Sequence, residues 1–570
     1  MSETRSFNLV DEDWIEVKWL DGHASIESLT TTLSHAGQIR EIIGDLPTQS
    51  FAILRLLLAV LQRAILTAPS FDRREKPVHF WGRLWQENDL PMKDISDYLE
   101  RWRDRFFLLG GDAPFMQVPD LHTARDEVST VGKIIAEVPD GHPFFTTRSG
   151  AETTALSAPE AARWLVHAHA YDSSGIKSGV VGDPEVKSGK SYPIGTGWSG
   201  GIGGIQVEGD CLRSTLLLNL RLAQAENDGR WVSDTDLPAW ERPVCGPGDS
   251  KRQPTGQVDL YTWQSRRIRL ICDGEFVTGV VLTNGDKLKP RNLFALEPMS
   301  GWRRSLNQEK LLKEKSPVYL PARLNAARAM WRGLDALLPT DAPTKMNGQD
   351  YLCPGIVDWI SALTSDESGT ALPDDLIVTL RGVGVVYGPQ ESTFADVVND
   401  RLIIHASLLS APGVPLVELA KSCVSDAADA VRQIGYLAQN LHLAAGGDSQ
   451  TTDGPRDRAT EVAYYTLDIA FRRWLSALQP TEGGVDSQQD HIHAAREQWR
   501  STARLILRQL GDDLLVQSGP QAFTGHATKD PKTPWMTSGT AARIFSGALR
   551  RALPLTTDTP HTSTTGKEHT

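Results

Sequence analysis

The last third of the chain constrains the fold most, because its apolar residues recur at the spacing of α-helices. Leu416, Trp499 and their apolar neighbours belong to four separate stretches with this period. Breaks rich in glycine, proline and polar residues separate the stretches, at 446–455, 480–490 and 518–534. Because amphipathic helices bury one face against partners, residues 408–555 are predicted to form a four-helix bundle. The tail, 556–570, is rich in Thr, Ser and Pro and is expected to be disordered.

Residues 1–407 combine strand and helix patterns. Apolar and polar residues alternate over 258–272, which is typical of half-buried strands. Helical spacing is found over 158–171, and a further helix is predicted over 321–338. We therefore expect an α+β fold, with a large mixed α/β N-terminal domain that contains small sheets, followed by the C-terminal four-helix bundle.

The composition argues against several classes of protein. The formal net charge is −12, which disfavours a protein that coats nucleic acid over its whole surface but allows a local basic patch. The five cysteines are scattered, without the spacing of a zinc site or a disulfide framework. The first residues lack the character of a signal peptide, and Arg55, Gln62 and Arg63 interrupt the most apolar run, 51–66. We expect a cytoplasmic protein with no metal and no cofactor.

A stretch from 171 to 207 is rich in glycine and contains Lys177, Lys187 and Lys190. Glycine allows the backbone to approach a ligand closely, and backbone N–H groups with nearby cations can hold a polyanion. The other interpretation is a surface loop without a ligand.

Three enzymatic motifs overlap this stretch, and the context argues against each. Residues 195–200 fit GxGxxG, but the strand before it and the helix after it that a dinucleotide site requires are not indicated. Residues 189–191 resemble the end of a Walker A loop, but Pro184 occupies the place of its first glycine. A GxSxG pattern centred on Ser199 is followed by glycines that disfavour the helix of a nucleophile elbow. A serine hydrolase that uses Ser199 stays an alternative.

Four segments occur in an order and spacing that resemble a known family. They are the start of the chain and three later segments, at 8–15, 114–117, 211–219 and 387–400. Together they are similar to CasA, the large-subunit family of the type I-E CRISPR surveillance complex, Cascade. The resemblance covers most of the chain and depends on joint order, since none of the segments is a strict catalytic signature. A cysteine-rich insert known in some members is absent.

The resemblance implies a DNA-recognition subunit that is not an enzyme. Members of this family recognise the protospacer-adjacent motif of target double-stranded DNA from the minor groove. They promote opening of the duplex for guide RNA pairing and help to recruit the helicase-nuclease for antiviral defence. The implied partners are the other Cascade subunits with CRISPR RNA, the target DNA and the helicase-nuclease. Besides the hydrolase, a scaffold that binds only protein is the remaining alternative.

The resemblance also implies four groups of site residues. The DNA-binding glycine loop is Gly175, Ile176, Lys177, Ser178 and Gly179. The lysine that enters the minor groove comes from the predicted hairpin 279–289, with Lys287 as the first choice and Lys289 as the second. The wedge that separates the first base pairs is Gln390, Glu391 and Ser392, and either Gln390 or Glu391 inserts. The guide-end loop, which contacts the guide end and the motif, is Phe144, Phe145 and Thr146.

Two local features accompany this assignment. Asn284-Gly285 is a strong hairpin signal and would place Lys287 and Lys289 just beyond a turn. The denser glycine run, 195–204, is interpreted as structural.

Overall fold

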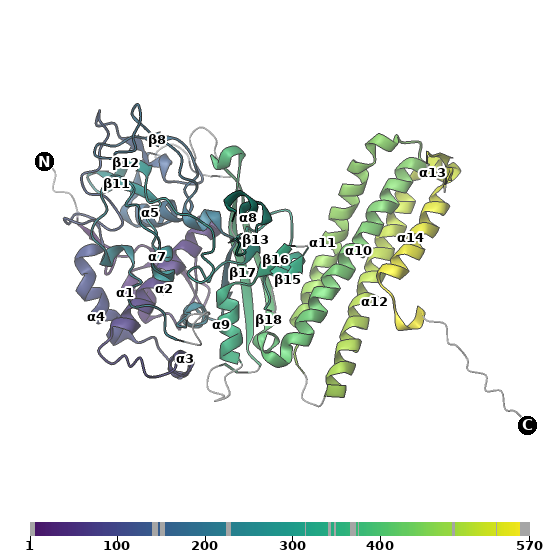
Figure 1. Cartoon of the computed structure of the whole chain (residues 1–570), viewed down its shortest axis with the longest axis horizontal. Helices are drawn as coiled ribbons and strands as arrows, with labels where there is room; N and C mark the ends of the chain where they lie inside the picture. The colour runs from purple at the N-terminus through teal and green to yellow at the C-terminus, as the bar shows by residue number, and fades with distance from the viewer. Residues whose placement is uncertain are drawn as a thin grey trace, which may run out of the picture. The chain divides into compact units, whose positions relative to one another are not determined.

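The computed structural model divides into two compact units, one of residues 1–402 with 409–411 and one of residues 403–408 with 412–570 (Figure 1). The structure describes residues 6–138, 146, 148, 154–223, 230–313, 315–339, 344–346, 349–364, 372–373, 375–480, 485–529, 531 and 533–558.

In the first unit, the described residues form nine α-helices and a series of small sheets. The helices are α1 (Leu29–Ser34), α2 (Pro47–Thr67), α3 (Pro77–Gln86), α4 (Met92–Trp102), α5 (Ala158–Tyr171), α6 (Leu212–Asn219), α7 (Gln257–Tyr261), α8 (Leu306–Leu312) and α9 (Gly355–Thr364).

The sheets are antiparallel wherever their pairing is described. Two of these sheets have two strands each: β1 (Phe7–Asn8) with β5 (Phe107–Leu109), and β8 (Lys177–Ser178) with β9 (Lys190–Ser191). Two sheets have three strands each, in the order β3 (Ala24–Glu27), β2 (Ile15–Trp19), β4 (Ile39–Ile42) and in the order β10 (Gly204–Glu208), β17 (Ile377–Tyr387), β18 (Phe394–His405). Two sheets have four strands each: β11 (Arg266–Asp273), β12 (Phe276–Asn284) and β6 (Ser129–Thr130), with β7 (Leu156–Ser157) also paired to β12, and β14 (Tyr319–Pro321), β13 (Trp302–Arg304), β16 (Gln349–Leu352) and β15 (Thr344–Met346). This mixture of helices and small sheets confirms the expected fold class.

Helix α2 lies at the centre of the first unit and is buried along almost its whole length. The polar residues that interrupt its apolar sequence are buried too: Arg55 binds Glu297 at 2.7 Å, and Arg63 binds Glu241 at 2.7 Å. Among the described residues, α2 is the one helix long and apolar enough to cross a membrane, but 94% of its most apolar window is buried inside the protein. Its properties are those of a core helix with satisfied internal charges.

The second unit contains four long helices in the stretches where the periodicity predicts them. They are α10 (Val414–Ala444), α11 (Asp453–Ser476), α12 (Val485–Gln517) and α14 (Ser538–Ala552), accompanied by the short α13 (Gly519–Thr524), β19 (His526–Ala527) and β20 (Trp535–Met536). Helix α10 packs against α11, α12 and α14 (Figure 1). Phe471, Trp474 and Trp499 form the aromatic part of the core, with Phe471 edge-on to Trp499 at 5.0 Å. Thr556–Asp558, at the start of the predicted tail, form a short 3-10 helix, and 559–570 lie outside the described residues.

Three local predictions are wrong. The turn of the β11–β12 hairpin is at Gly274 (φ 61°), and Asn284-Gly285 instead ends β12. The reason is close packing: Gly285 N donates to Ser265 O at 2.9 Å, and a Cβ on Gly285 would lie 2.5 Å from Gln264 O. The second concerns 321–338, where the structure has the end of β14 and then a 3-10 helix over Met330–Ala336. The third concerns the first part of 258–272, where Gln257–Tyr261 form helix α7 and strand β11 begins only at Arg266. The Asp236 carboxylate accepts the N–H groups of Val258 and Asp259 and so caps a helix there.

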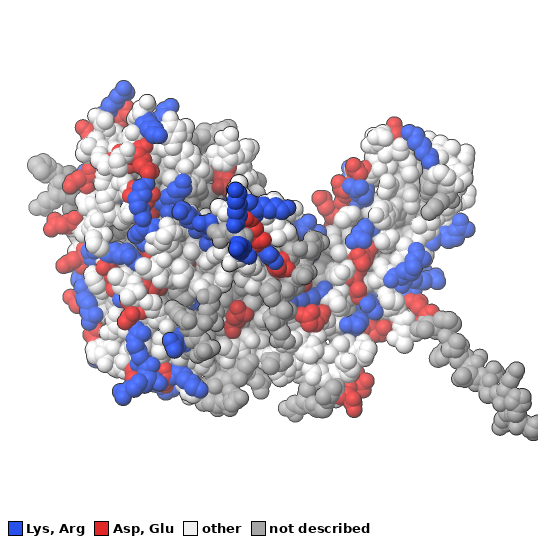
Figure 2. Space-filling view, viewed as in Figure 1, with Lys and Arg blue, Asp and Glu red and all other residues white. Residues whose placement is uncertain are grey.

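Charged side chains of both signs are interspersed on the face drawn in Figure 2. This distribution fits a chain with a formal net charge of −12, in which any attraction for DNA must come from local groups of cations.

Candidate nucleic-acid interface

The hairpin between β17 and β18 ends in a strained, exposed turn. Gln390 and Glu391 both have left-handed backbones, with φ of 57° and 56°. Such conformations cost non-glycine residues on the order of 1–3 kcal/mol each and concentrate at functional sites. A hydrogen bond from Gly388 N to Thr393 O (2.8 Å) closes the turn. The predicted wedge therefore lies at the tip of an ordered hairpin, with Gln390 and Ser392 exposed.

The two candidate wedge side chains have different surroundings. Glu391 Oε1 accepts a hydrogen bond from Arg323 Nη1 at 2.6 Å, and Arg323 Nε donates to Gly201 O at 3.2 Å. Within the described part of the chain, no side-chain hydrogen bond holds Gln390. Glu391 is thus tied to the body of the unit, whereas the neutral amide of Gln390 extends into solvent.

The glycine loop lies directly beside the wedge. Ser174 N, just before the loop, donates to Glu391 O at 2.8 Å. A cavity of about 250 Å³ separates the two segments and is lined by 174–178 from one side and 392–394 from the other. The fold thus brings together two groups of residues that are far apart in the sequence.

The two ends of the glycine loop differ in their packing. A Cβ on Gly175 would meet no atom within 4 Å. A Cβ on Gly179 would lie 2.5 Å from Val186 Cγ1 and 2.9 Å from the Gly189 carbonyl carbon. Gly179 N also donates to Gly189 O at 2.9 Å, at the end of the β8–β9 hairpin. Gly179 is therefore needed by the fold, whereas Gly175 leaves space for another molecule.

A buried cluster of charges lies beneath the loop. Asp172 Oδ2 is bound by Lys177 Nζ at 2.6 Å and also by Arg266 Nε. Burial alone would raise the pKa of the Asp172 carboxyl, but the Lys177 and Arg266 cations outweigh it and hold the pKa below its usual range. The ammonium group of Lys177 is thus occupied within the protein, whereas Lys187 and Lys190 of the same hairpin are exposed.

The lysine segment (287–289) follows directly after an anchored end of β12. Asn284 Nδ2 donates to Tyr192 O at 2.9 Å and to Ser191 Oγ at 3.1 Å, which connects β12 with the glycine hairpin. The Asp286 carboxylate is buried and accepts from Ser250 N at 2.8 Å. Beyond Asp286, both Lys287 and Lys289 are exposed. The predicted lysines are therefore presented from a fixed point.

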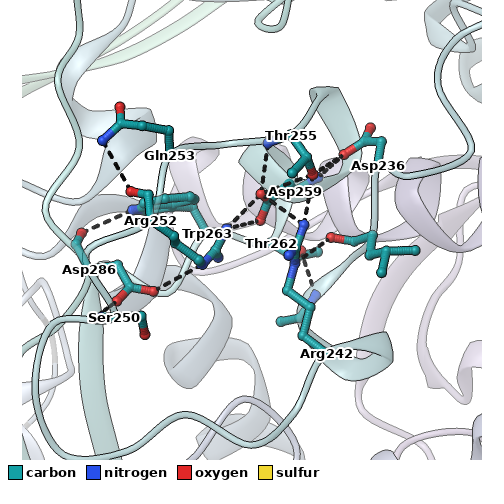
Figure 3. A network of polar contacts seen from close by, with 12 residues as sticks. Asp236, Arg242, Ser250, Arg252, Gln253, Thr255, Asp259, Thr262, Trp263 and Asp286 are labelled. Atoms are coloured by element: carbon teal, nitrogen blue, oxygen red, sulfur yellow. Dashed lines mark hydrogen bonds and ion pairs between the residues drawn. The ribbon is translucent and has the colours of Figure 1, made fainter.

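Figure 3 shows the polar network that joins Asp259 of helix α7 and Asp286 through the loop that contains Arg252. The buried Asp259 carboxylate accepts from Arg252 Nη1 at 2.6 Å and from Arg242 Nη2 at 3.1 Å. Arg252 also lies over the Trp263 ring, 4.1 Å from its centroid, and its Nε is 3.4 Å from Asp286 Oδ2. The network thus links helix α7 with the base of the lysine segment.

The same network contains a carboxyl with a shifted pKa. Burial raises the pKa of Asp236 to about 6, although Asp236 accepts hydrogen bonds from Val258 N and Asp259 N. These two bonds satisfy backbone donors at the start of α7.

A second cleft, of about 510 Å³, lies between the lysine segment and the wedge. Its lining includes Leu288 and Pro290 on one side, Glu391 and Arg323 on another, and the start of the glycine run. The wedge thus borders both hollows: Glu391 lines the cleft beside the lysine segment, and Ser392 lines the cavity beside the glycine loop.

The guide-end loop is described only in part. Phe144 and Phe145 lie outside the described residues. Thr146 Oγ1 accepts from Arg148 N at 3.0 Å, and Arg148 Nε donates to Glu137 at 3.0 Å. Residues 132–136, which precede Glu137, line the cavity beside the glycine loop, so Thr146 is connected with the wall of that cavity.

The surroundings of Ser199 do not fit a hydrolase. Ser199 is only 3% exposed, lies in the 3-10 helix Trp198–Gly201, and adjoins a cavity of about 10 Å³. Of the two histidines on α5, His169 is hydrogen-bonded to Met116 O and His167 to Thr48 Oγ1. Among the described residues no group of three or more His, Cys, Asp or Glu could hold a metal ion.

The glycine run packs against the protein's own backbone. A Cβ on Gly197 would lie 2.5 Å from the carbonyl carbon of Ala170 and the N of Tyr171. This close approach explains the glycine at position 197 by packing alone, without a bound ligand.

Sequence reasoning missed the residues that hold the site together. They are Asp172, Arg266, Arg267, Asn284, Asp286 and Arg323. The one available signal is the pair of adjacent arginines at the start of a strand pattern, where ordinary alternation would place at most one of them in the interior.

Comparisons with known proteins assign the family. The family model described as CRISPR-associated protein Cse1 matches residues 8–510. CRISPR-associated protein CasA/Cse1 of Thermus thermophilus is 26% identical over 530 residues, which cover 89% of this chain and 94% of that protein.

Solved structures agree with this match. The crystal structure of Thermobifida fusca Cse1 has a TM-score of 0.84 and 39% identity and covers 96% of this chain and 98% of its own. A chain of a CRISPR RNA-guided surveillance complex shares the fold, with a TM-score of 0.63, 17% identity and coverage of 89% and 99%. The resemblance to the large subunit of type I-E Cascade is confirmed, and the chain belongs to the CRISPR-associated Cse1 family, whose members are also named CasA.

Proposed function

We propose that this chain recognises the protospacer-adjacent motif of target double-stranded DNA from the minor groove and starts the opening of the duplex for guide RNA pairing. In this proposal the chain acts without catalysis of its own, in the cytoplasm, within a Cascade complex of protein subunits and CRISPR RNA. Pairing with the guide supplies most of the sequence specificity, and the protein recognises only the short motif.

The observation that carries the proposal is the hydrogen bond between Ser174 N and Glu391 O. It joins a backbone loop that leaves open space at Gly175 to a strained turn that exposes Gln390. The minor groove is about 6 Å wide and offers a degenerate acceptor pattern, so it is best tested by small backbone and a few polar groups. A wedge fixed next to such a loop can enter the base stack as soon as the motif is bound.

Lys287 is the first choice for the minor-groove cation, and Lys289 the second. Both are exposed, and the residue before them is anchored in the interior. A cation on a fixed base senses the width and the negative potential of the groove better than one on a mobile loop.

Gln390 is the residue that we propose to insert. Its side chain is exposed and neutral, whereas the Glu391 carboxylate is bound to Arg323. Moving Glu391 into the duplex would break that ion pair and bring a negative charge close to the phosphates. Glu391 and Ser392 then act as the support of the wedge.

The remaining partners follow from the family. In this proposal the guide-end loop contacts the subunit at the guide end of the complex, and the assembled complex recruits the helicase-nuclease. The shared fold with a chain of a CRISPR RNA-guided surveillance complex supports membership of such a complex.

The experiment measures encounter and opening separately in a reconstituted complex. A fluorescent adenine analogue at the first base pair beside the motif reports opening, and a dye on the distal end of the duplex reports binding. Gln390→Ala is expected to slow opening roughly tenfold, because unstacking a base step costs a few kcal/mol that the inserted side chain offsets in part. First binding should change by less than about twofold, because phosphate contacts dominate encounter.

Two variants complete the design. Gln38→Ala, an exposed glutamine outside the site, is the matched control and should behave like the parent. Glu391→Ala separates the two wedge candidates. Parental opening rates in both Gln390→Ala and Glu391→Ala would exclude the wedge, and unchanged binding of every motif by Gly175→Ala and Lys287→Ala would favour the protein-only scaffold.

A further inference from the structure

Two adjacent arginines on β11 hold the two sides of the candidate site. Arg266 and Arg267 are 0% and 1% exposed. Because successive side chains of a strand point to opposite faces, they extend in different directions from neighbouring backbone positions. Burying two guanidinium groups is costly unless nearly all their donors are bonded, so the bonds that they form show what they are for.

Arg266 binds the base of the glycine loop. Its Nη2 donates to the carbonyl oxygens of Asp172 (3.1 Å), Ser173 (3.0 Å) and Gly195 (2.9 Å). Its Nε is bound to the Asp172 carboxylate, which Lys177 of the loop also binds. The residues before the loop, the loop lysine and the start of the glycine run are therefore fixed to one point of β11.

Arg267 binds the base of the lysine segment. Its Nη2 donates to Asp286 Oδ1 at 2.5 Å and to Ser250 Oγ at 3.1 Å, and its Nε donates to Gly246 O at 2.8 Å. Trp263 Nε1 donates to Asp286 O at 3.0 Å, which fixes the peptide that leads to Lys287. Asp286 is thus held through its carboxylate and through its backbone (Figure 3).

Strand β11, which carries both arginines, is packed too closely against the end of β12 to shift relative to it. Arg266 pairs with Asn284 across the hairpin, and Asp286 N donates to Gln264 O at 3.0 Å. A Cβ on Gly285 would lie 2.8 Å from the backbone N of Arg266, so the chains are in close contact. Because Arg266 and Arg267 are adjacent on β11, the spacing of two successive residues sets the distance between the glycine loop and the lysine segment.

We propose that Arg266 and Arg267 are positioning residues for motif recognition, because they fix the spacing between the glycine loop and the lysine segment. This inference rests on the proposed function. Two elements that test a groove about 6 Å wide lose discrimination when their separation changes by a fraction of that width. Contacts with phosphates tolerate such a change, because they depend on charge more than on geometry.

The test uses the complete reconstituted complex and target duplexes that carry every sequence at the motif position. Arg266→Lys and Arg267→Lys keep the charge but cannot bind several acceptors in one plane. The measured quantity is the ratio of affinities for the best and the average motif. We expect this ratio to fall roughly tenfold in each variant, while binding of the average motif changes less than about twofold.

Arg63→Lys is the matched control. Arg63 is a buried arginine of the same unit whose hydrogen bonds go to Glu241 and to Asp234 O, and not to the glycine loop or the lysine segment. Loss of a buried guanidinium destabilises this variant as well, but the ratio should stay at the parental value. A parental ratio in the Arg266 and Arg267 variants, or an equal loss for all motifs, would overturn the inference.

If an arginine variant fails to assemble into the complex, Asp286→Asn tests the inference in its place. It keeps the shape of the side chain and removes the negative charge that Arg267 and Arg252 bind, so a fall of about threefold in the ratio is expected. A parental ratio in an assembled Asp286→Asn complex counts against the inference. Lys287→Ala and Gly175→Ala are measured in parallel: if they change the ratio and the positioning variants do not, only the inference fails, whereas if none of them does, the proposed function fails.

Discussion

Gly175 and Gly197 belong to two glycine-rich segments that lie close together in the sequence, but the two residues have opposite surroundings. In the glycine run, 195–204, an added Cβ on Gly197 would collide with the end of helix α5, whereas one on Gly175 of the glycine loop would meet nothing within 4 Å. Glycine allows another group to approach the backbone closely. In the run the approaching partner is the protein's own backbone, and in the loop the space is free for another molecule. Composition alone does not distinguish these cases.

The largest expected effect that tests this comparison is the loss of stability in Gly197→Ala. Its Cβ would lie 2.5 Å from backbone atoms of Ala170 and Tyr171, which cannot move without shifting α5. Overpacking of this kind costs on the order of 3 kcal/mol. Denaturant unfolding of the isolated chain, followed by tryptophan fluorescence, measures the change. A midpoint equal to that of Gly175→Ala would contradict the distinction between the two segments.

Gly175→Ala should have the opposite profile. The free energy of unfolding is expected to change by less than about 0.5 kcal/mol, because the Cβ meets open space and φ is not positive. Binding of the preferred motif by the complex should weaken roughly tenfold, since a methyl group then lies where the DNA backbone or groove approaches.

Gly454→Ala is the matched control for this prediction. It also adds a Cβ into open space, at an exposed position of α11. Its motif binding should equal that of the parent. Unchanged binding in Gly175→Ala would show that the open space at the loop is not used by DNA.

Variants of the wedge should have a smaller effect, and they test whether the left-handed backbone of Gln390 is strained. In Gln390→Ala the left-handed backbone persists, whereas in Gln390→Gly it costs almost nothing. The glycine variant should therefore be about 1 kcal/mol more stable than the alanine variant in denaturant unfolding. Both should open target DNA equally slowly. Equal stabilities would mean that the turn stores no strain, and faster opening in the glycine variant would mean that backbone mobility matters more than the side chain.

The sequence predicted those parts of the fold that depend on local periodicity. The four long helices of the second unit follow from apolar spacing, and strand β11 follows from alternation, although the same pattern extends into 257–261, which form helix α7. The Asn284-Gly285 prediction was wrong because its glycine is required by contact with Gln264, which no local rule contains. The predicted helix over 321–338 was wrong for a similar reason: Pro321 belongs to β14, which pairs with β13.

The candidate site was accessible from the sequence only through resemblance. Positions such as Gln390 and Lys287 come from the order of segments, and no spacing rule predicts that Ser174 lies beside Glu391. The role of Lys177 could not be deduced either. Its partner Asp172 is close in sequence, but the burial of the pair depends on Arg266, which belongs to a distant strand.

Lys287→Ala is expected to have the smallest effect and tests whether the lysine segment acts together with the glycine loop. Removing one cation near phosphates should weaken binding a few-fold and flatten the plot of log affinity against log salt by about 0.9 at most. Lys18→Ala, an exposed lysine on β2, is the control and should leave the slope unchanged. Because Arg266 and Arg267 connect the two elements, Gly175→Ala with Lys287→Ala should lose less affinity than the sum of the single losses. Strict additivity would show that loop and lysine contact the DNA independently.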